Sequence, residues 1–103
     1  LAQAPQTTAI IYSNDLMAMA GMKRAVEDGR RVPDDLSVIG WDGLELSRYL
    51  QPSLSTVLTH PFTDGETAAR LLLDRIGGTD FDEVVQTENP RFLPSASSGP
   101  APR

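Results

Sequence analysis

The chain has 103 residues, of which 40% are hydrophobic and 22% are charged, so its size and composition are those of one ordinary globular domain. Its formal net charge is -5 and its nine basic residues are scattered along the sequence, which argues against binding of this segment to nucleic-acid phosphates. The absence of cysteine excludes disulfides, thiol catalysis and cysteine-ligated zinc, and the single histidine excludes a multi-histidine metal site.

The beginning of the chain carries no targeting signal that we recognise. Residues 1–6 lack a basic region followed by an apolar core, so we expect no secretory signal. No apolar run approaches the roughly 20 residues that span a bilayer, so we also expect no transmembrane helix. Because the sequence opens on Leu1 and no element begins there, we expect the chain to be a piece of a longer protein.

The stretch from Thr8 to Asp42 predicts a strand, a helix and a second strand. An apolar run ends at polar residues around Asn14, an amphipathic segment follows as far as Gly29, and residues 36–40 form a second apolar run. About 35 residues is the size of a βαβ unit, whose two strands are parallel. Because ligands of open parallel sheets bind beyond the carboxyl ends of the strands, we expect Asn14 and Asp42 on one shared rim.

The alternation of strands and helices continues downstream. Residues 44–50 predict one short helical turn, and residues 54–59 predict a third strand because they are β-branched and alternate in polarity. The apolar stripe of residues 63–76 predicts a helix, and Thr63 stands three residues before Glu66, which is the spacing of a capping box.

The last quarter of the chain predicts little regular structure. Residues 81–87 have weak strand character, and residues 88–94 predict one short extended piece that its prolines confine to a sheet edge. Residues 95–103 lack apolar side chains to bury, so we expect a disordered tail.

Four segments of the chain carry a resemblance to a known family. In their order and spacing, from Pro5 to Gly78 without gaps, they resemble the C-terminal part of lactose-repressor/galactose-repressor (LacI/GalR) family transcription regulators. The segments are TAIIYSNDLMA at 8–18, AVEDG at 25–29, RVPDDLSVIGWDG at 31–43 and YLQPSLSTV at 49–57.

The resemblance implies a fold and a division of the chain. Members of this family have a helix-turn-helix DNA-binding head, a hinge helix and a two-lobed effector-binding domain similar to periplasmic sugar-binding proteins. The implied fold class is α/β, a parallel-sheet βαβ lobe of the type I periplasmic-binding-protein fold, present as a fragment. The implied division is the C-terminal lobe at 1–62, a helix and weak strand of the other lobe at 63–87, a return strand at 88–94 and the tail at 95–103.

The resemblance also implies ligand-binding residues. Asn14 matches a position that hydrogen-bonds the effector, and Asp42 matches a carboxylate that binds ligand hydroxyls. Pro61 or Phe62 falls where the family places an apolar residue of the pocket. Each polar residue has a purely structural alternative: Asn14 is a good helix N-cap, and Asp42 suits an Asx-turn that satisfies local backbone amides.

A second surface is implied for the first predicted helix. Met19 and Leu50 match positions of the family's dimer interface, so we expect a homodimer. This fits the helix itself, because its apolar residues surround much of the cylinder and predict more than one buried face. Trp41, next to Asp42, is expected to be buried, because neighbouring side chains of a strand point to opposite sides.

The function that follows is effector binding within a cytoplasmic transcription regulator. The expected effector is a carbohydrate-like small molecule, and DNA is bound only through the missing head. The alternative is the C-terminal part of a periplasmic sugar-binding protein of an importer, and upstream sequence decides between them. We expect no enzymatic activity, no cofactor and no metal site, because the sequence places no nucleophile beside a general base. We expect His60 to be a hinge residue rather than a catalytic base.

Overall fold

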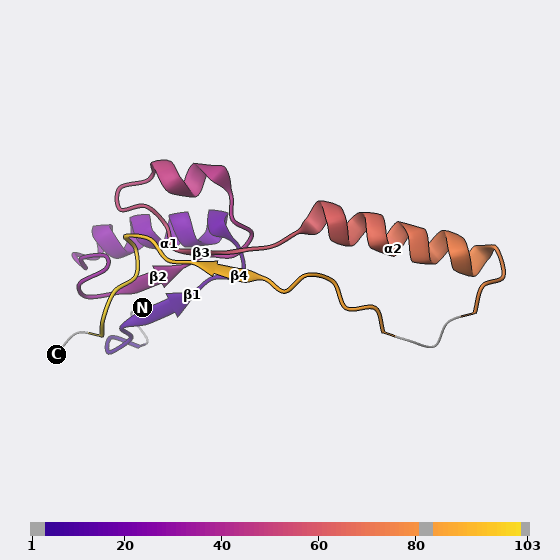
Figure 1. Ribbon diagram of the computed structural model, residues 1–103. Coiled ribbons are helices and arrows are strands. Elements are labelled where there is room, and N and C mark those ends of the chain that lie inside the picture. The colour runs from indigo at the N-terminus through magenta and orange to yellow at the C-terminus, as the bar shows by residue number, and fades with distance from the viewer. Residues whose placement is uncertain (1–3, 81–83, 102–103) are drawn as a thin grey trace. The chain divides into compact units, whose positions relative to one another are not determined.

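The computed structural model describes residues 4–80 and 84–101, and the chain forms two units (Figure 1). The first unit holds residues 1–58 and 91–103, and the second holds residues 59–90. The first stretch of the first unit therefore ends at Leu58, and the resemblance places the end of the C-terminal lobe at Phe62. The elements in chain order are β1 (Ala9–Ile11), α1 (Asp15–Glu27), β2 (Ser37–Ile39), the 3-10 helix η1 (Glu45–Tyr49), β3 (Thr56–Leu58), α2 (Pro61–Ile76) and β4 (Arg91–Leu93).

The strands of the first unit form two two-stranded sheets, β1–β2 and β3–β4, which isolated bridges connect in the order β1, β2, β3, β4. β1 is parallel to β2 over three residue pairs, from Ala9 opposite Ser37 to Ile11 opposite Ile39. Isolated parallel bridges join β2 to β3, and β4 pairs antiparallel with β3. The expected strand–helix–strand unit with parallel strands is thus present, and a third parallel strand extends it.

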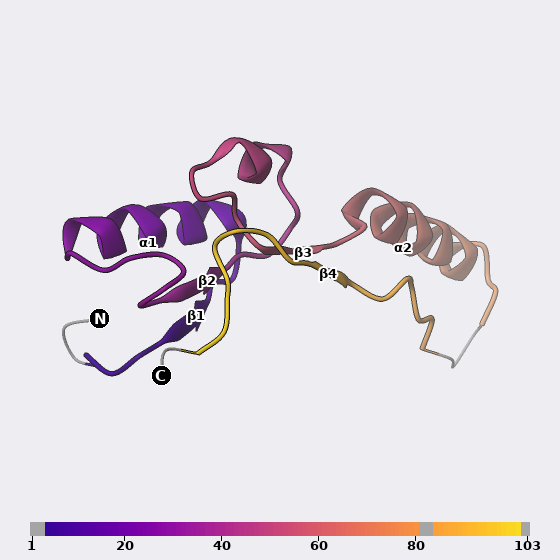
Figure 2. The ribbon, with the colours of Figure 1, turned by 60° about the vertical axis from the view of Figure 1, so that its left-hand side comes forward.

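Helix α1 covers one face of these strands and supplies half of the core (Figure 2). Its buried side chains Ala18, Met22 and Ala25 follow the spacing of one helical face. They pack against Val38 of β2 and against Leu36 and Leu54, which directly precede β2 and β3 in the chain. The Asn14 side chain caps the helix, and Gly29, with a φ of +76°, follows its end in the left-handed conformation that glycine adopts without strain.

The tail is the main departure from the sequence-based expectation. Ser97 is fully buried between the beginnings of β2 and β3, so the described residues 95–101 are not a disordered tail. Its backbone accepts a hydrogen bond from Val38 N and donates one to Ser53 O, while its hydroxyl donates to Val38 O and accepts from Ser55 N. The prediction of disorder failed because hydrogen bonds, rather than apolar side chains, attach this segment.

The second unit begins with α2, which starts earlier than the capping-box pattern predicted. Pro61 occupies the first turn and His60 is the N-cap residue, without a side-chain cap hydrogen bond. Proline fits the first helical turn because its missing N–H has no partner there in any helix. The predicted strand at 81–87 is absent from its described part, since residues 84–87 have no strand structure, and residues 81–83 lie outside the described residues.

Candidate functional site

The carboxyl ends of β1 and β2 bring Asn14 and Asp42 to the same edge of the sheet. The turn after β1 is hydrogen-bonded to the turn after β2, because Asp15 N donates to Trp41 O at 2.8 Å. Asn14 directly precedes the donor of this bond, and Asp42 directly follows its acceptor. The two residues that the sequence singled out for ligand binding therefore lie on neighbouring turns.

Asn14 caps α1 and still keeps part of its hydrogen-bonding capacity. Its Oδ1 accepts a hydrogen bond from Met17 N at 2.8 Å. Within residues 4–80 and 84–101 its Nδ2 has no hydrogen-bond partner, and the residue is half-buried. The capping role and a ligand role are compatible, because the cap uses the oxygen and leaves two N–H donors.

Asp42 combines an exposed carboxylate with an unusual backbone. In the part of the chain that the structure describes, this carboxylate has no hydrogen bond and no ion pair, so the Asx-turn alternative is not what the structure shows. Its φ is +108°, a conformation that L-residues rarely adopt. Such backbone conformations cost about 1–3 kcal/mol each and cluster at binding and catalytic sites.

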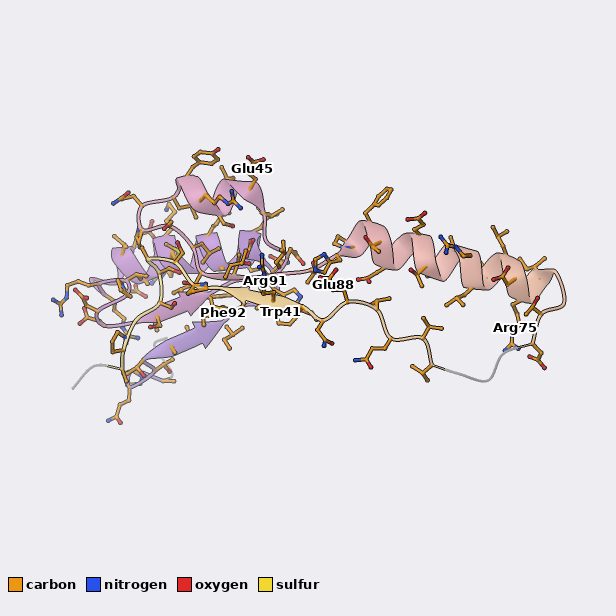
Figure 3. All side chains as sticks on the ribbon, in the orientation of Figure 1. Trp41, Glu45, Arg75, Glu88, Arg91 and Phe92 are labelled. Atoms are coloured by element: carbon orange, nitrogen blue, oxygen red, sulfur yellow. The ribbon has the colours of Figure 1, made fainter. Side chains whose placement is uncertain are left out.

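Trp41 is 38% exposed, so the expectation that it is buried was wrong. β2 ends at Ile39, and the alternation of side chains between two faces no longer holds in the turn that follows. The indole ring stands directly before Asp42 in the sequence, and Figure 3 shows it at the edge of the strands. An exposed aromatic face next to a carboxylate is a suitable surface for a sugar ring.

A fully buried carboxylate, Asp15, lies beneath this edge. Its Oδ2 accepts hydrogen bonds from Leu44 N at 2.7 Å and Ser47 Oγ at 2.9 Å, and its Oδ1 accepts one from Thr56 Oγ1 at 2.5 Å. It is the acidic residue in the first turn of α1, where a negative charge is favourable. Its partners lie 29–41 positions away, so no local pattern could have identified them.

A cavity of about 300 Å³ opens beside η1, and two arginines line it. Neither Arg48 nor Arg91 has a salt bridge within the described residues, and neither was singled out in the sequence. Neither Asn14 nor Asp42 lines this cavity. The lining residues are Gly43, Leu44, Ser47, Arg48, Leu54, Thr56, Leu58, Arg91, Leu93, Pro94 and Ser95.

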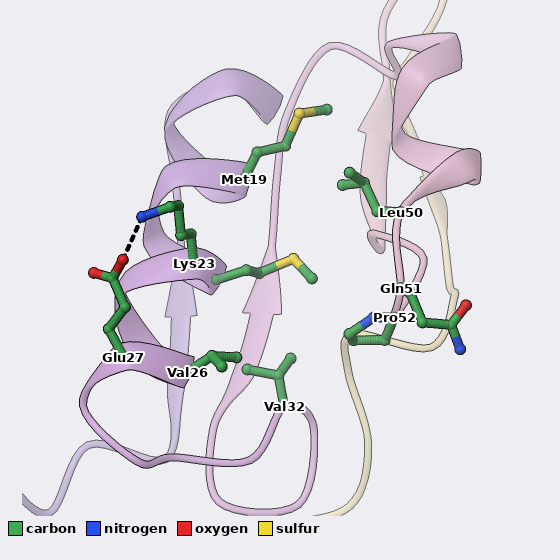
Figure 4. Close-up of a pocket in the computed structure, with 9 residues that line it drawn as sticks. Met19, Lys23, Val26, Glu27, Val32, Leu50, Gln51 and Pro52 are labelled. Carbon is green, nitrogen blue, oxygen red and sulfur yellow. Dashed lines mark hydrogen bonds and ion pairs between the residues drawn. The ribbon is translucent and has the colours of Figure 1, made fainter.

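Met19 and Leu50 lie on opposite walls of a second cavity, of about 310 Å³, between α1 and residues 50–52 (Figure 4). We call this cavity the α1 groove. Its floor is mostly apolar, and the ion pair between Lys23 and Glu27 lies along its rim. The lining residues are Met19, Met22, Lys23, Val26, Glu27, Val32, Leu50, Gln51 and Pro52.

Pro61 and Phe62, the other predicted pocket residues, lie in the first turn of α2 and belong to the second unit. The Phe62 side chain is 85% exposed. Nearby in the chain, His60 Nε2 lies 3.7 Å from Glu88 Oε2 within the same unit.

No metal centre or membrane segment is found in the described part of the chain. Among residues 4–80 and 84–101, no three His, Asp or Glu side chains gather closely enough to hold a metal ion. Over the same residues, no helix has the length and apolar character needed to cross a bilayer.

Comparison with known proteins identifies the family. A family model described as a periplasmic binding protein-like domain matches residues 1–98. The HTH-type transcriptional repressor PurR of Aliivibrio fischeri (strain MJ11) is 37% identical over 95 residues, which is 92% of this chain and 28% of the repressor.

Solved structures agree with that match. The structure described as a transcriptional regulator CelR–cellobiose complex has a TM-score of 0.84 and 31% identity, covering 95% of this chain and 30% of that chain. A LacI family transcriptional regulator from Arthrobacter sp. FB24 in complex with lactose has a TM-score of 0.76 and 34% identity, covering 96% and 38%. The chain spans less than a third of the length of the PurR relative. It belongs to the periplasmic binding protein-like domain family, as a fragment of the effector-binding domain of LacI/GalR-type transcription regulators.

Proposed function

We propose that this chain is part of the effector-binding domain of a cytoplasmic, DNA-binding transcription regulator, and that DNA contact is made by a part of the protein outside this segment. The observation that carries the proposal is the sheet edge at which Asn14 and Asp42 lie on neighbouring turns. The Asp42 carboxylate has no hydrogen-bond or ion-pair partner among residues 4–80 and 84–101. The relatives named above are regulators, which favours this function over the solute-binding protein of an importer.

The chemistry of the edge suits a polyhydroxylated effector. A carboxylate accepts hydrogen bonds from two adjacent hydroxyls, and an amide N–H donates to a hydroxyl or ring oxygen. The exposed indole of Trp41 adds an apolar face of the kind that stacks on a sugar ring. Pro61 and Phe62 are proposed as further pocket residues, and the exposed ring of Phe62 offers the apolar surface that this role needs.

Effector binding controls DNA binding only if the effector prefers one arrangement of the intact protein. A ligand with equal affinity for two arrangements changes neither of their populations. We propose that the effector distinguishes open from closed lobes and thereby changes the affinity for DNA, typically by 5- to 150-fold for a coupling of about 1–3 kcal/mol.

The α1 groove is proposed as part of a homodimer interface. Met19 and Leu50 lie on its two walls, and its mostly apolar floor is the kind of surface that a second subunit covers. A dimer would explain why α1 has apolar side chains on more than its sheet-facing side, since Leu16, Met17 and Val26 are exposed in the single chain.

A thermal-shift screen of the intact protein tests the effector. The panel contains cellobiose, lactose, glucose, ribose and nucleobases, because cellobiose and lactose are named with the related structures. A compound at 100 times its dissociation constant stabilises the folded state by about 2.7 kcal/mol, so binding raises the melting temperature measurably. The proposal expects a sugar to do so.

A DNA-binding measurement then tests regulation. Genomic fragments retained by the intact protein are titrated with and without the sugar that raises its melting temperature. The proposal expects the DNA dissociation constant to change severalfold. A sugar that binds and leaves this constant unchanged would argue against a regulator, and a protein that no compound stabilises would argue against sugar binding.

A further inference from the structure

We propose that buried Asp15 is a positioning residue that holds Asp42 in its ligand-binding conformation. This inference rests on the proposed effector role of Asp42. Asp15 itself is fully buried and does not contact a ligand in this account.

Three successive backbone amides fix the turn that carries Asp42. Asp15 accepts a hydrogen bond from one of them directly and is linked to a second through the Thr56 hydroxyl. Asp42 N donates to Val57 O at 2.9 Å, Gly43 N donates to Thr56 Oγ1 at 3.2 Å, and Leu44 N donates to Asp15 Oδ2 at 2.7 Å. Thr56 Oγ1 in turn donates to Asp15 Oδ1 at 2.5 Å. One carboxylate therefore fixes Leu44 directly and Gly43 through a single hydroxyl.

The turn needs such an anchor because its backbone is strained. Asp42 has a φ of +108°, and the Asp42 side chain makes no hydrogen bond in the described residues that would stabilise this conformation. A strained residue persists only where the surroundings hold it. Without the bonds from Gly43 and Leu44, Asp42 would relax to a negative φ, and its carboxylate would point in another direction.

The surroundings of Asp15 are built for a carboxylate. All three of its partners are donors, and a carboxylate is the side chain that only accepts. Its position in the first turn of α1 also places it at the positive end of the helix dipole. Gly40 gives it room, because a Cβ atom at that position would lie 2.1 Å from Asp15 Oδ1.

The replacement Asp15→Asn tests this role with little change in shape. An amide nitrogen in place of Oδ2 would face the Leu44 N–H donor. In place of Oδ1 it would donate to Thr56 Oγ1, whose proton would have to turn away from Asp15. In both orientations the negative charge that strengthens the hydrogen bond from Leu44 is lost. The matched control is Asp28→Asn, which makes the same replacement at the other end of α1, where the carboxylate only pairs with Arg24.

A second pair of variants keeps the test valid if Asp15→Asn folds poorly. Thr56→Val preserves the shape of the side chain and removes the hydroxyl that joins Gly43 N to Asp15. Thr56→Ser restores that hydroxyl. We expect Thr56→Val to behave like a weaker Asp15→Asn and Thr56→Ser to behave like the parent protein.

The first readout is amide hydrogen exchange in the intact protein without ligand. Asp15→Asn should speed exchange at Gly43 and Leu44 by about tenfold relative to Ala25 in the core of α1, because a hydrogen bond to a charged group contributes about 1.5–3 kcal/mol. Unchanged exchange at Gly43 and Leu44 would overturn the inference. Equal acceleration at Ala25 would also overturn it, because that result describes general destabilisation.

The second readout is calorimetric titration with cellobiose and lactose. Asp15→Asn should weaken binding about tenfold while Asp28→Asn leaves it unchanged. Faster exchange with unchanged binding would overturn the positioning role while leaving the proposed function intact. If neither sugar binds even the parent protein, these two disaccharides are excluded as effectors, and exchange at Gly43 and Leu44 still decides whether Asp15 holds the turn.

Discussion

The replacement Ser97→Ala should destabilise the first unit although it removes a single hydroxyl. That hydroxyl donates to Val38 O at 2.6 Å and accepts from Ser55 N at 2.8 Å, in a place where Ser97 is fully buried. Alanine would leave both backbone groups without these partners. A buried polar group that loses its partner costs about 1–3 kcal/mol, so we expect a total of about 2–3 kcal/mol.

Urea unfolding of the intact protein measures this cost. For a slope of about 2 kcal/mol per molar urea, the midpoint of the transition should fall by about 1 M. Ser95→Ala is the matched control, since Ser95 is exposed and its hydroxyl only meets that of Ser53, so its effect should stay within about 0.5 kcal/mol. Equal midpoints for the two variants would refute the reasoning and favour the disordered tail that the composition suggested.

Three further predictions follow from other parts of the structure. Gly21→Ala should destabilise the protein by about 1–3 kcal/mol, because the Cβ atom of the new alanine would lie 2.1 Å from the Tyr12 hydroxyl oxygen. A rise in the midpoint of urea unfolding would contradict this prediction. The pKa of Asp35 is lowered from 3.8 to about 2 by hydrogen bonds from the Arg31 side chain and backbone. A carboxyl whose pKa is lower in the folded than in the unfolded state stabilises the protein at pH values above its unfolded-state pKa. This stabilisation should be lost as the pH falls from about 4 toward 2. A carboxyl NMR titration of Asp35 with a midpoint near 3.8 would contradict the prediction. Leu50→Glu, which places a charge in the α1 groove, should convert the proposed dimer to a monomer in sedimentation velocity, and an unchanged sedimentation coefficient would place the interface elsewhere.

Much of the first unit could be predicted because its signals are local. Apolar runs that end in polar residues predicted β1 and β2, and the amphipathic segment between them predicted α1. The rule that parallel strands end at one edge then placed Asn14 near Asp42 without any knowledge of side-chain contacts.

The remaining features depend on contacts between distant residues. Ser97 is held by hydrogen bonds to Ser55 and Val38, which lie 42 and 59 positions earlier in the chain. The number of apolar residues in the tail carries no information about these bonds. The role of Asp15 was hidden for the same reason. Asn14 already explained the helix start, so nothing in the local sequence required a second function for the acid beside it.

The central claim is that the Asp42 carboxylate binds effector hydroxyls. Asp42→Gly separates this claim from stability, because glycine adopts a φ of +108° without strain while the side chain that carries the carboxylate is removed. Calorimetric titration of the intact protein with the sugar that most raises its melting temperature gives the test. We predict affinity about ten- to a hundredfold weaker for Asp42→Gly, with a urea midpoint no lower than that of the parent protein. Parent-like affinity in this variant would contradict the claim.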